Sequence, residues 1–295
     1  MDLLIASIGF GLITASIVAL GAVGFTLQFG ITNIFNLAYG EVMGASAFVA
    51  YQVYENTNNV LALWVVGAVF GALLSFTLNR VVIGPLIRKG TSPFGLVIVT
   101  LALGLILENL VLAIGGAQYF TLVVPPGDSF VIGPMIFTLS QLSIICAAVL
   151  VMLALHVVLT QTQLGRAMRA TATNATLART CGINVNHVKD IVWTLSGLLC
   201  GLAGVALVIN IETFQASTAQ VFVVVVIAGA ILGGIGQPYG AMLGAGIIGL
   251  VTEVSAAYIG SGYKDVAAFV ILVLVLLIRP QGIRGAIAAG RGLAS

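Results

Sequence analysis

The chain has little charge. Only 7% of its 295 residues are Asp, Glu, Lys or Arg, whereas a soluble domain carries about a quarter. Hydrophobic residues make up 60% of the chain, and the mean hydropathy is +1.18. This composition excludes an ordinary soluble protein and indicates a polytopic membrane protein. The net charge of +2 is too small to indicate a nucleic-acid partner.

Patterns typical of catalysis and cofactor binding are also missing. The two histidines, His156 and His187, stand in no HExxH pattern, and no GxSxG or GxxxxGK[ST] motif occurs. Cys146, Cys181 and Cys200 form no CxxC or Cys/His ligand pattern, so we interpret them as small packing residues. We therefore expect no catalytic residues, no metal and no cofactor, and a protein that is not itself an enzyme.

Long apolar stretches dominate what is present. A membrane-spanning helix needs about 20 predominantly apolar residues. The candidate spans are residues 5–28, 36–54, 60–83, 94–116, 139–160, 191–211, 221–236, 239–260 and 266–279. The last is short and 221–236 is rich in glycine, so eight or nine spans are expected. The N-terminus lacks a basic region and a cleavage site, which favours a retained span. The prediction is an all-α, polytopic transmembrane helical bundle in a single domain over residues 1–295.

The distribution of charge predicts the orientation. Basic residues gather at Arg80, Arg88 and Lys89, in the 161–190 loop, and at Arg279, Arg284 and Arg291. The positive-inside rule assigns all three groups to the cytoplasm. The other side then receives Asp2, Glu55, Asp128, Glu212 and Asp265, with Lys264 as its one basic residue. Nine spans, with the N-terminus outside and the C-terminus in the cytoplasm, fit this distribution.

Polar residues interrupt the chain between the first two spans. Gly30, Asn33, Asn36 and Gly40 lead to Glu41 inside a predicted span. Irregular backbone at membrane depth persists only where protein buries it or where it lines a cavity. We therefore predict a broken or re-entrant helix at residues 30–41, with Asn33, Asn36, Gly40 and Glu41 beside a translocation pathway. The alternative is a structural network in which Glu41 accepts hydrogen bonds from free backbone N–H groups.

Two more carboxylates lie inside predicted spans. A central acidic residue costs about 2.5 kcal/mol or more in hydrocarbon, so each is expected to face the bundle interior or water. Glu108 is interpreted as structural, and Glu253 is expected to pair with Ser255 or a neighbouring helix.

One internal similarity joins YGEVMGA at residues 39–45 with YGAMLGA at residues 239–245. Transporters are often built from duplicated bundles, but two helix starts that use small residues for close packing explain the similarity as well. Both segments run outward in the predicted topology, so the similarity is no evidence for an inverted repeat.

The polar segment 161–190 holds four of the eleven Lys and Arg residues. Leu164, Met168, Thr171, Ala175, Ala178 and Cys181 recur every three or four residues. This spacing predicts a short amphipathic helix from Gly165 to Cys181, with the arginines on its polar flank and Gly182 as its stop. Such a helix suits a docking surface for a cytosolic partner, or an interfacial helix whose arginines meet lipid phosphates.

The motif Gly165-Arg166-Ala167-Met168-Arg169-Ala170, followed by Asn174, Ala178 and Gly182-Ile183, resembles the coupling loop of branched-chain amino-acid ABC importer permeases. The resemblance continues in residues 36–41, 232–236, 240–241, 263–265 and 279–283. These motifs occur in order over residues 20–285. The chain is most similar to the shorter, H-type permease.

The resemblance implies a subunit of an ATP-driven importer in the bacterial inner membrane. Its partners would be a second, M-type permease, two cytosolic ATPase subunits and a periplasmic substrate-binding protein, all around a lipid bilayer. The residues implied in ATPase coupling are Gly165, Arg166, Met168, Arg169, Ala170, Asn174, Ala178, Gly182 and Ile183. Closure of the ATPases would drive alternating access. Branched-chain or other hydrophobic amino acids are the favoured cargo, with urea or short amides as an alternative. An ion-coupled secondary transporter that uses Glu41 or Glu253 is a further alternative.

Overall fold

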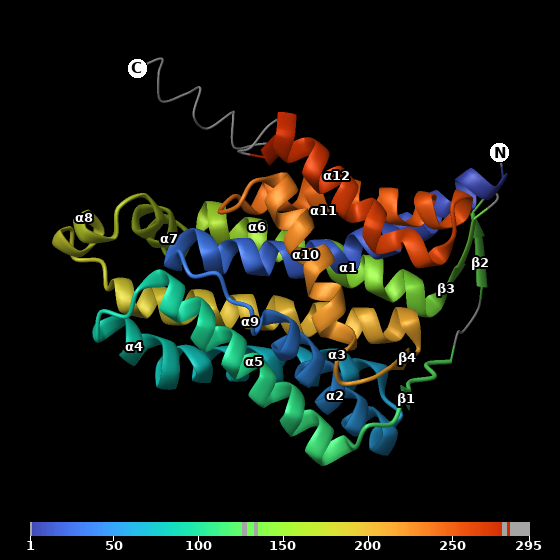
Figure 1. Ribbon diagram of the computed structural model, residues 1–295, viewed down its shortest axis with the longest axis horizontal. Coiled ribbons are helices and arrows are strands. Elements are labelled where there is room, and N and C mark those ends of the chain that lie inside the picture. The colour runs from blue at the N-terminus through green and yellow to red at the C-terminus, as the bar shows by residue number, and fades with distance from the viewer. Residues whose placement is uncertain (1, 126–128, 133–134, 279–281, 284–295) are drawn as a thin grey trace.

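The computed structural model describes residues 2–125, 129–132, 135–278 and 282–283, and most of them are helical (Figure 1). The long helices are α1 (Asp2–Thr32), α2 (Tyr39–Thr57), α3 (Val60–Leu78), α5 (Pro93–Gly115), α6 (Leu139–Gln161), α9 (Val185–Ile211), α10 (Thr218–Gly233), α11 (Pro238–Tyr258) and α12 (Lys264–Ile278). The short ones are a π-helix (Asn79–Ile83), α4 (Gly84–Arg88), α7 (Gln163–Thr173), α8 (Ala175–Thr180) and a 3-10 turn (Ser261–Tyr263). Most long helices run side by side along the long axis of the molecule.

Each predicted apolar stretch corresponds to one long helix, which confirms the polytopic bundle. Six helical segments of the described chain are long and apolar enough to cross a membrane: Leu4–Thr32, Val60–Arg88, Pro93–Gly115, Leu139–Gln161, Val185–Ile211 and Pro238–Tyr258. Helices α10 and α12 are shorter, and α2 is less apolar because it carries Glu41 and Glu55. Arg279, Arg284 and Arg291, with the first three residues of the 279–283 motif, lie outside the described residues.

The predicted break between α1 and α2 is present. Asn33 adopts a left-handed conformation (φ 52°) that Asn tolerates better than most residues, and residues 33–38 are not helical. The chain turns back into the bundle, because the Tyr39 hydroxyl donates to the Gly21 carbonyl at 3.0 Å. Gly21 lies about 16 Å along α1 from Thr32. Helix α2 therefore begins deep within the bundle, as a re-entrant helix does.

Two helices extend further than their apolar stretches predicted. The span expected to end at residue 83 continues through the π-helix and α4 to Arg88. The Gly84 N–H bonds the Asn79 carbonyl, a wider turn that accommodates Pro85, which has no N–H to donate. The span expected from residue 191 begins at Val185, because the Asn184 side chain accepts from the His187 N–H at 3.2 Å and caps the helix.

Four short strands were not predicted. β1 (Phe120–Thr121) pairs antiparallel with β4 (Thr213–Phe214), and β2 (Ser129–Ile132) pairs with β3 (Met135–Thr138). Both ribbons lie at the end of the molecule that holds the N-terminus (Figure 1). The rings of Phe120 and Phe214 are 5.4 Å apart and also contact Tyr51 of α2. Aromatic contacts between distant segments hold the first ribbon, which explains why local sequence did not reveal it.

Helices α3 and α9 pack through two glycine pairs. Gly67 and Gly71 lie one turn apart on α3, and Gly197 and Gly201 lie one turn apart on α9. A Cβ atom on Gly201 would overlap the Gly67 carbonyl oxygen, and one on Gly197 would overlap the Gly71 carbonyl oxygen. Two GxxxG motifs therefore face each other and bring the backbones into contact, a packing mode of membrane helices.

The two similar heptads both begin helices and both pack on α10. Gly40 of α2 lies against Val223 (3.0 Å from an added Cβ), and Gly44 lies against Ala219 (3.2 Å). A Cβ atom on Gly244 of α11 would overlap the Gly229 carbonyl oxygen of α10. The shared glycines thus let α2 and α11 approach α10 closely, which accounts for the similarity through packing.

Replacing Gly201 with Leu is expected to separate α3 from α9, because the new side chain has no space at the backbone contact. Overpacking of this kind destabilises by about 1–3 kcal/mol. The measurement is thermal unfolding of the detergent-purified protein. Gly246→Leu is the matched control, since nothing lies within 4 Å of an added Cβ there. Equal melting temperatures for the two variants would contradict the packing assignment.

Candidate functional site

The re-entrant segment 33–38 is held by side-chain hydrogen bonds. Asn36 is buried, and its Oδ1 accepts from the Ala38 N–H at 3.1 Å. Thr100 of α5 accepts from the Leu37 N–H at 3.2 Å through its Oγ1. These bonds satisfy backbone groups that no helix or strand pairs, which allows irregular backbone at this depth.

A buried polar network under this segment was not predicted. The Asn36 amide donates to Gln28 Oε1 at 3.5 Å, and Ser196 Oγ donates to the same atom at 3.1 Å. Cys200 Sγ donates to the Tyr39 carbonyl at 3.1 Å. The network joins α1, α2 and α9 across more than 150 residues of sequence, so no local pattern could have shown it.

The predicted pathway residues occupy different environments. Asn33 is exposed at the end of α1. Asn36 supports the backbone, and Gly40 packs on α10. Glu41 is buried in the first turn of α2 beneath α5. Asn36, Gly40 and Glu41 thus cluster at the start of α2, whereas Asn33 lies apart from them.

Glu253 pairs with neighbouring helices, although not with Ser255. Lys264 Nζ lies 2.8 Å from each of its carboxylate oxygens, and Thr14 of α1 donates to Oε1 at 2.8 Å. The Ser255 hydroxyl has no partner among the described residues. The Glu253 charge is therefore compensated by an ion pair that joins α11 to the start of α12.

The 161–190 segment folds as two helices rather than the single helix expected from Gly165 to Cys181. Asn174 separates α7 from α8, and its Oδ1 accepts from the N–H groups of Thr176 and Leu177, both at 3.0 Å. This is the N-cap geometry that Asn favours. The predicted apolar stripe is buried at Met168, Thr171 and Ala178. Cys181 is exposed, and so is Cys146, so the packing interpretation holds for Cys200 alone.

Helix α7 packs tightly on the end of α6. A Cβ atom on Gly165 would overlap the Leu159 carbonyl oxygen, so a larger residue would push α7 away. Met168 is fully buried under the helix. Arg169 is exposed on the polar flank, and its guanidinium turns back to donate to the Leu159 carbonyl. A cation there complements the carbonyl end of α6. Arg166 and Arg179 are exposed.

Gly182 ends α8, as predicted. Its φ is +85°, its N–H bonds the Arg179 carbonyl at 3.0 Å, and the Ile183 N–H bonds the Ala178 carbonyl at 3.0 Å. This pair of bonds is a Schellman motif, which places a glycine in the left-handed conformation just after a helix. The Gly182-Ile183 dipeptide therefore sets the turn from α8 into α9.

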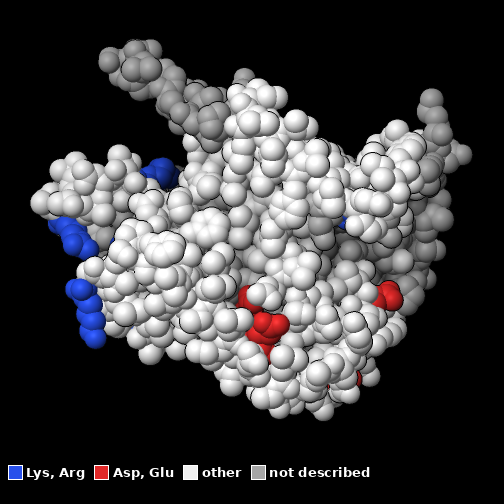
Figure 2. Space-filling model, in the orientation of Figure 1, with Lys and Arg blue, Asp and Glu red and all other residues white. Residues whose placement is uncertain are grey.

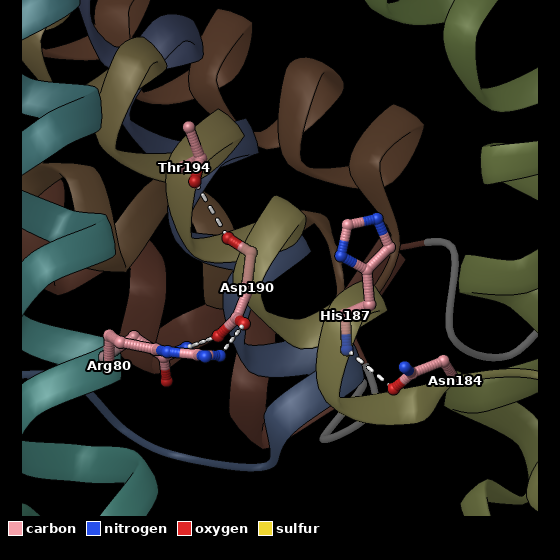
Figure 3. Close-up of polar contacts among 6 residues, drawn as sticks. Arg80, Asn184, His187, Asp190 and Thr194 are labelled. Carbon is pink, nitrogen blue, oxygen red and sulfur yellow. Dashed lines mark hydrogen bonds and ion pairs between the residues drawn. The ribbon is translucent and has the colours of Figure 1, made fainter.

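A polar cluster connects α9 to the π-helix. Asp190 accepts from Arg80 at 2.9 Å and from Asn79 at 2.7 Å. Figure 3 shows Arg80 reaching across to Asp190, while Thr194 and the Asn184 cap lie along α9. The π-helix turns Asn79 and Arg80 towards α9 together. The sequence analysis did not single out Asp190, because it is one acidic residue at the end of a basic segment.

The α7–α8 pair and the Asp190 cluster lie at one end of the bundle. Figure 2 shows most of the visible Lys and Arg side chains at the end that holds α4, α7 and α8, with acidic side chains towards the middle and the other end. A cavity of about 830 Å³ opens at the basic end, lined by Gly30 and Ile31 of α1, Met168 and Arg169 of α7, and the α10–α11 turn. The end of α1, which leads into the re-entrant segment, thus lies across this cavity from α7.

A model of the family described as the permease component of branched-chain amino acid transport systems matches residues 7–278. The chain belongs to this family. The high-affinity permease protein LivH of Escherichia coli (strain K12) is 31% identical over 294 residues, covering 93% of this chain and 93% of LivH. BraD of Pseudomonas aeruginosa is 28% identical over 289 residues, covering 93% and 94%. The probable permease LivH of Methanocaldococcus jannaschii is 31% identical over 292 residues, covering 93% and 90%. No solved structure matches significantly.

The comparisons confirm the resemblance seen in the sequence. Together with the apolar helices, membership of this permease family makes the chain a multi-pass inner-membrane transport protein. Its relatives are named as transport permeases and not as enzymes.

Replacing Asn36 of this permease with Ala removes the acceptor for the Ala38 N–H, and leaving that N–H unpaired is expected to cost about 1–3 kcal/mol at the start of α2. Amide hydrogen exchange over residues 37–42 should then become faster. Asn36→Ser, which keeps a hydroxyl acceptor, should restore part of the protection. Asn56→Ala is the control, since Asn56 is exposed and bonds its own helix. Wild-type exchange in Asn36→Ala would contradict the assignment of Asn36 as a support of the re-entrant backbone.

Proposed function

We propose that this chain is the membrane-spanning permease subunit of an ATP-driven importer for branched-chain amino acids. The observation that carries the proposal is the family match over residues 7–278, together with relatives named as high-affinity branched-chain amino acid permeases over nearly their whole length. The whole chain, residues 1–295, forms one transmembrane permease domain. A second permease completes the pathway, and a periplasmic binding protein delivers the cargo.

The segment 161–190 docks onto separate cytosolic ATPase subunits. Its α7–α8 pair projects at the basic end, with Arg166 and Arg179 exposed, while Gly165 and Met168 fasten α7 to the bundle. Charge-assisted hydrogen bonds from such arginines fix the register of a docked helix. The chain contains no GxxxxGK[ST] motif, so ATP hydrolysis is assigned to other subunits.

Motion passes from the docked helices to the pathway through the end of α1. Helix α7 packs against α1, α6 and α9, and the cavity between α7 and the α1 end leaves room for α7 to move. Because α1 continues directly into the re-entrant segment, displacement of its end is transmitted to Asn36, Gly40 and Glu41. A closely packed bundle responds to such displacement by switching between alternative packings. This is alternating access driven from the cytoplasmic side.

Reversing the charge of Arg166 and Arg179 (Arg166→Glu with Arg179→Glu) is expected to weaken ATPase binding at least tenfold, because like charges would face the partner. The measurement is co-purification of the ATPase subunits with the tagged permease, followed by ATP-dependent leucine uptake in proteoliposomes. Arg88→Glu with Lys89→Glu is the charge-matched control, located at the same end where α4 leads into α5. Undiminished ATPase binding by the double variant would remove the docking assignment. A wild-type assembly without ATP-dependent uptake of leucine, isoleucine or valine would refute the proposed function.

The proposed orientation places the basic end in the cytoplasm and the N-terminus outside. In a variant with Thr57→Cys at the end of α2, the new thiol should react with a membrane-impermeant maleimide in spheroplasts. In a variant with Lys89→Cys, the thiol should react only after the membrane is permeabilised. Both positions are exposed, and the background replaces Cys146 and Cys181, which are exposed as well. The reverse labelling pattern would invert the topology.

A further inference from the structure

Glu41 is a buried carboxylate, and one of its two oxygens has no hydrogen-bond partner among the described residues. Its side chain is 5% exposed, and the unpaired oxygen is Oε2. No Lys or Arg of the described chain forms an ion pair with it, in contrast to Glu253, which binds Lys264. Its position in the first turn of α2 favours negative charge there. Glu41 is therefore a buried carboxylate whose negative charge is not balanced by a cation of the described chain.

The Glu41 carboxylate faces the middle of α5. A Cβ atom on Gly104 would lie 3.5 Å from Glu41 Cδ, and Gly104 is at the midpoint of Pro93–Gly115. Glu108 lies one turn further on the same face of α5, so its carboxylate is on the side of α5 that faces Glu41. Two carboxylates therefore lie on the facing sides of α2 and α5 at mid-depth of the bundle, and Gly104 places no side chain between them.

Two neighbouring carboxylates repel each other unless a cation or a shared proton lies between them. Ionisable groups inside a membrane bundle mark substrate or ion routes, and substrate sites of transporters built with broken helices lie near the midplane. The cation that an amino-acid importer carries to this depth is the α-ammonium group of its cargo. We propose that Glu41 and Glu108 form the subsite that receives this ammonium group. This assignment depends on the proposed function, and it distinguishes amino acids from neutral solutes such as urea or short amides.

Access to the pair is controlled by α5. Helix α5 packs mainly against α2. Its Leu96 also joins a small apolar cluster with Ile83 and Trp193, and its outward face carries exposed apolar side chains such as Leu101 and Leu105. Thr100 ties α5 to the re-entrant segment through the Leu37 N–H and, at 3.4 Å, the Phe35 carbonyl. A shift of α5 over the re-entrant segment therefore uncovers Glu41 beside Glu108, which is already half-exposed.

The test uses the complete importer in proteoliposomes, with leucine uptake and ATP hydrolysis measured together. Glu108 is half-exposed, so Glu108→Gln is expected to leave folding intact. This variant should lower leucine uptake at least tenfold, because a charge-assisted hydrogen bond to the ammonium group is lost. Glu41→Gln should do the same, and Glu41→Asp should recover part of the uptake. Gly104→Ala, whose Cβ fits at ordinary contact distance, should also lower uptake by filling the space above Glu41. Asn109→Ala, an exposed neighbour on α5, is the control and should transport normally.

The ratio of uptake to ATP hydrolysis separates a subsite from a structural role. In the proposed subsite, ATP hydrolysis stimulated by the loaded binding protein persists while leucine uptake falls. Parallel loss of hydrolysis, uptake and assembly in both Gln variants would overturn the subsite and assign the pair a structural role. Wild-type leucine uptake in both Gln variants would also overturn it while leaving the proposed function intact. A wild-type importer that carries only neutral solutes would refute both proposals.

Discussion

The backbone of residues 33–38 leaves the helical conformation inside an apolar bundle, where water cannot satisfy its polar groups. Each unpaired N–H or C=O there is costly, so the surrounding side chains supply partners. Asn36 accepts from the Ala38 N–H, and Thr100 accepts from the Leu37 N–H. The need to pair these backbone groups explains three features: the position of α5, the start of α2 and the polar network on α9.

Close helix packing is the second condition for the break. Because α2 begins at mid-depth, it can replace a full span only if its neighbours enclose it. Gly40 and Gly44 bring α2 against α10, Gly244 brings α11 to the same helix, and the glycine pairs of α3 and α9 join backbones directly. Small residues permit these contacts where lipid offers no hydrophobic driving force between helices. The chain contains 36 glycines, and those at the helix contacts allow the backbones to approach closely.

The carboxylates of the bundle show how environment separates residues of one type. Glu253 has its charge compensated by Lys264 and is part of the framework. Asp190 accepts from Arg80 and Asn79 near the basic end, where it ties α9 to the π-helix. Glu41 has no such partner among the described residues, and this difference alone separates it as a candidate for binding cargo.

The sequence alone determined the polytopic class, the helical segments, the break near residues 30–41 and the family, because hydropathy, glycine placement and ordered motifs are local properties. It also placed the stop at Gly182, since a left-handed residue after a helix favours glycine. The interruption at Asn174 is also local, since its own side chain caps α8. Tertiary structure decided what depends on the packing of neighbouring helices: Lys264 as partner of Glu253, and the return of Arg169 to Leu159. It also decided that Glu108 lies on the side of α5 that faces Glu41, because only the packing of α5 on α2 brings together residues 67 positions apart.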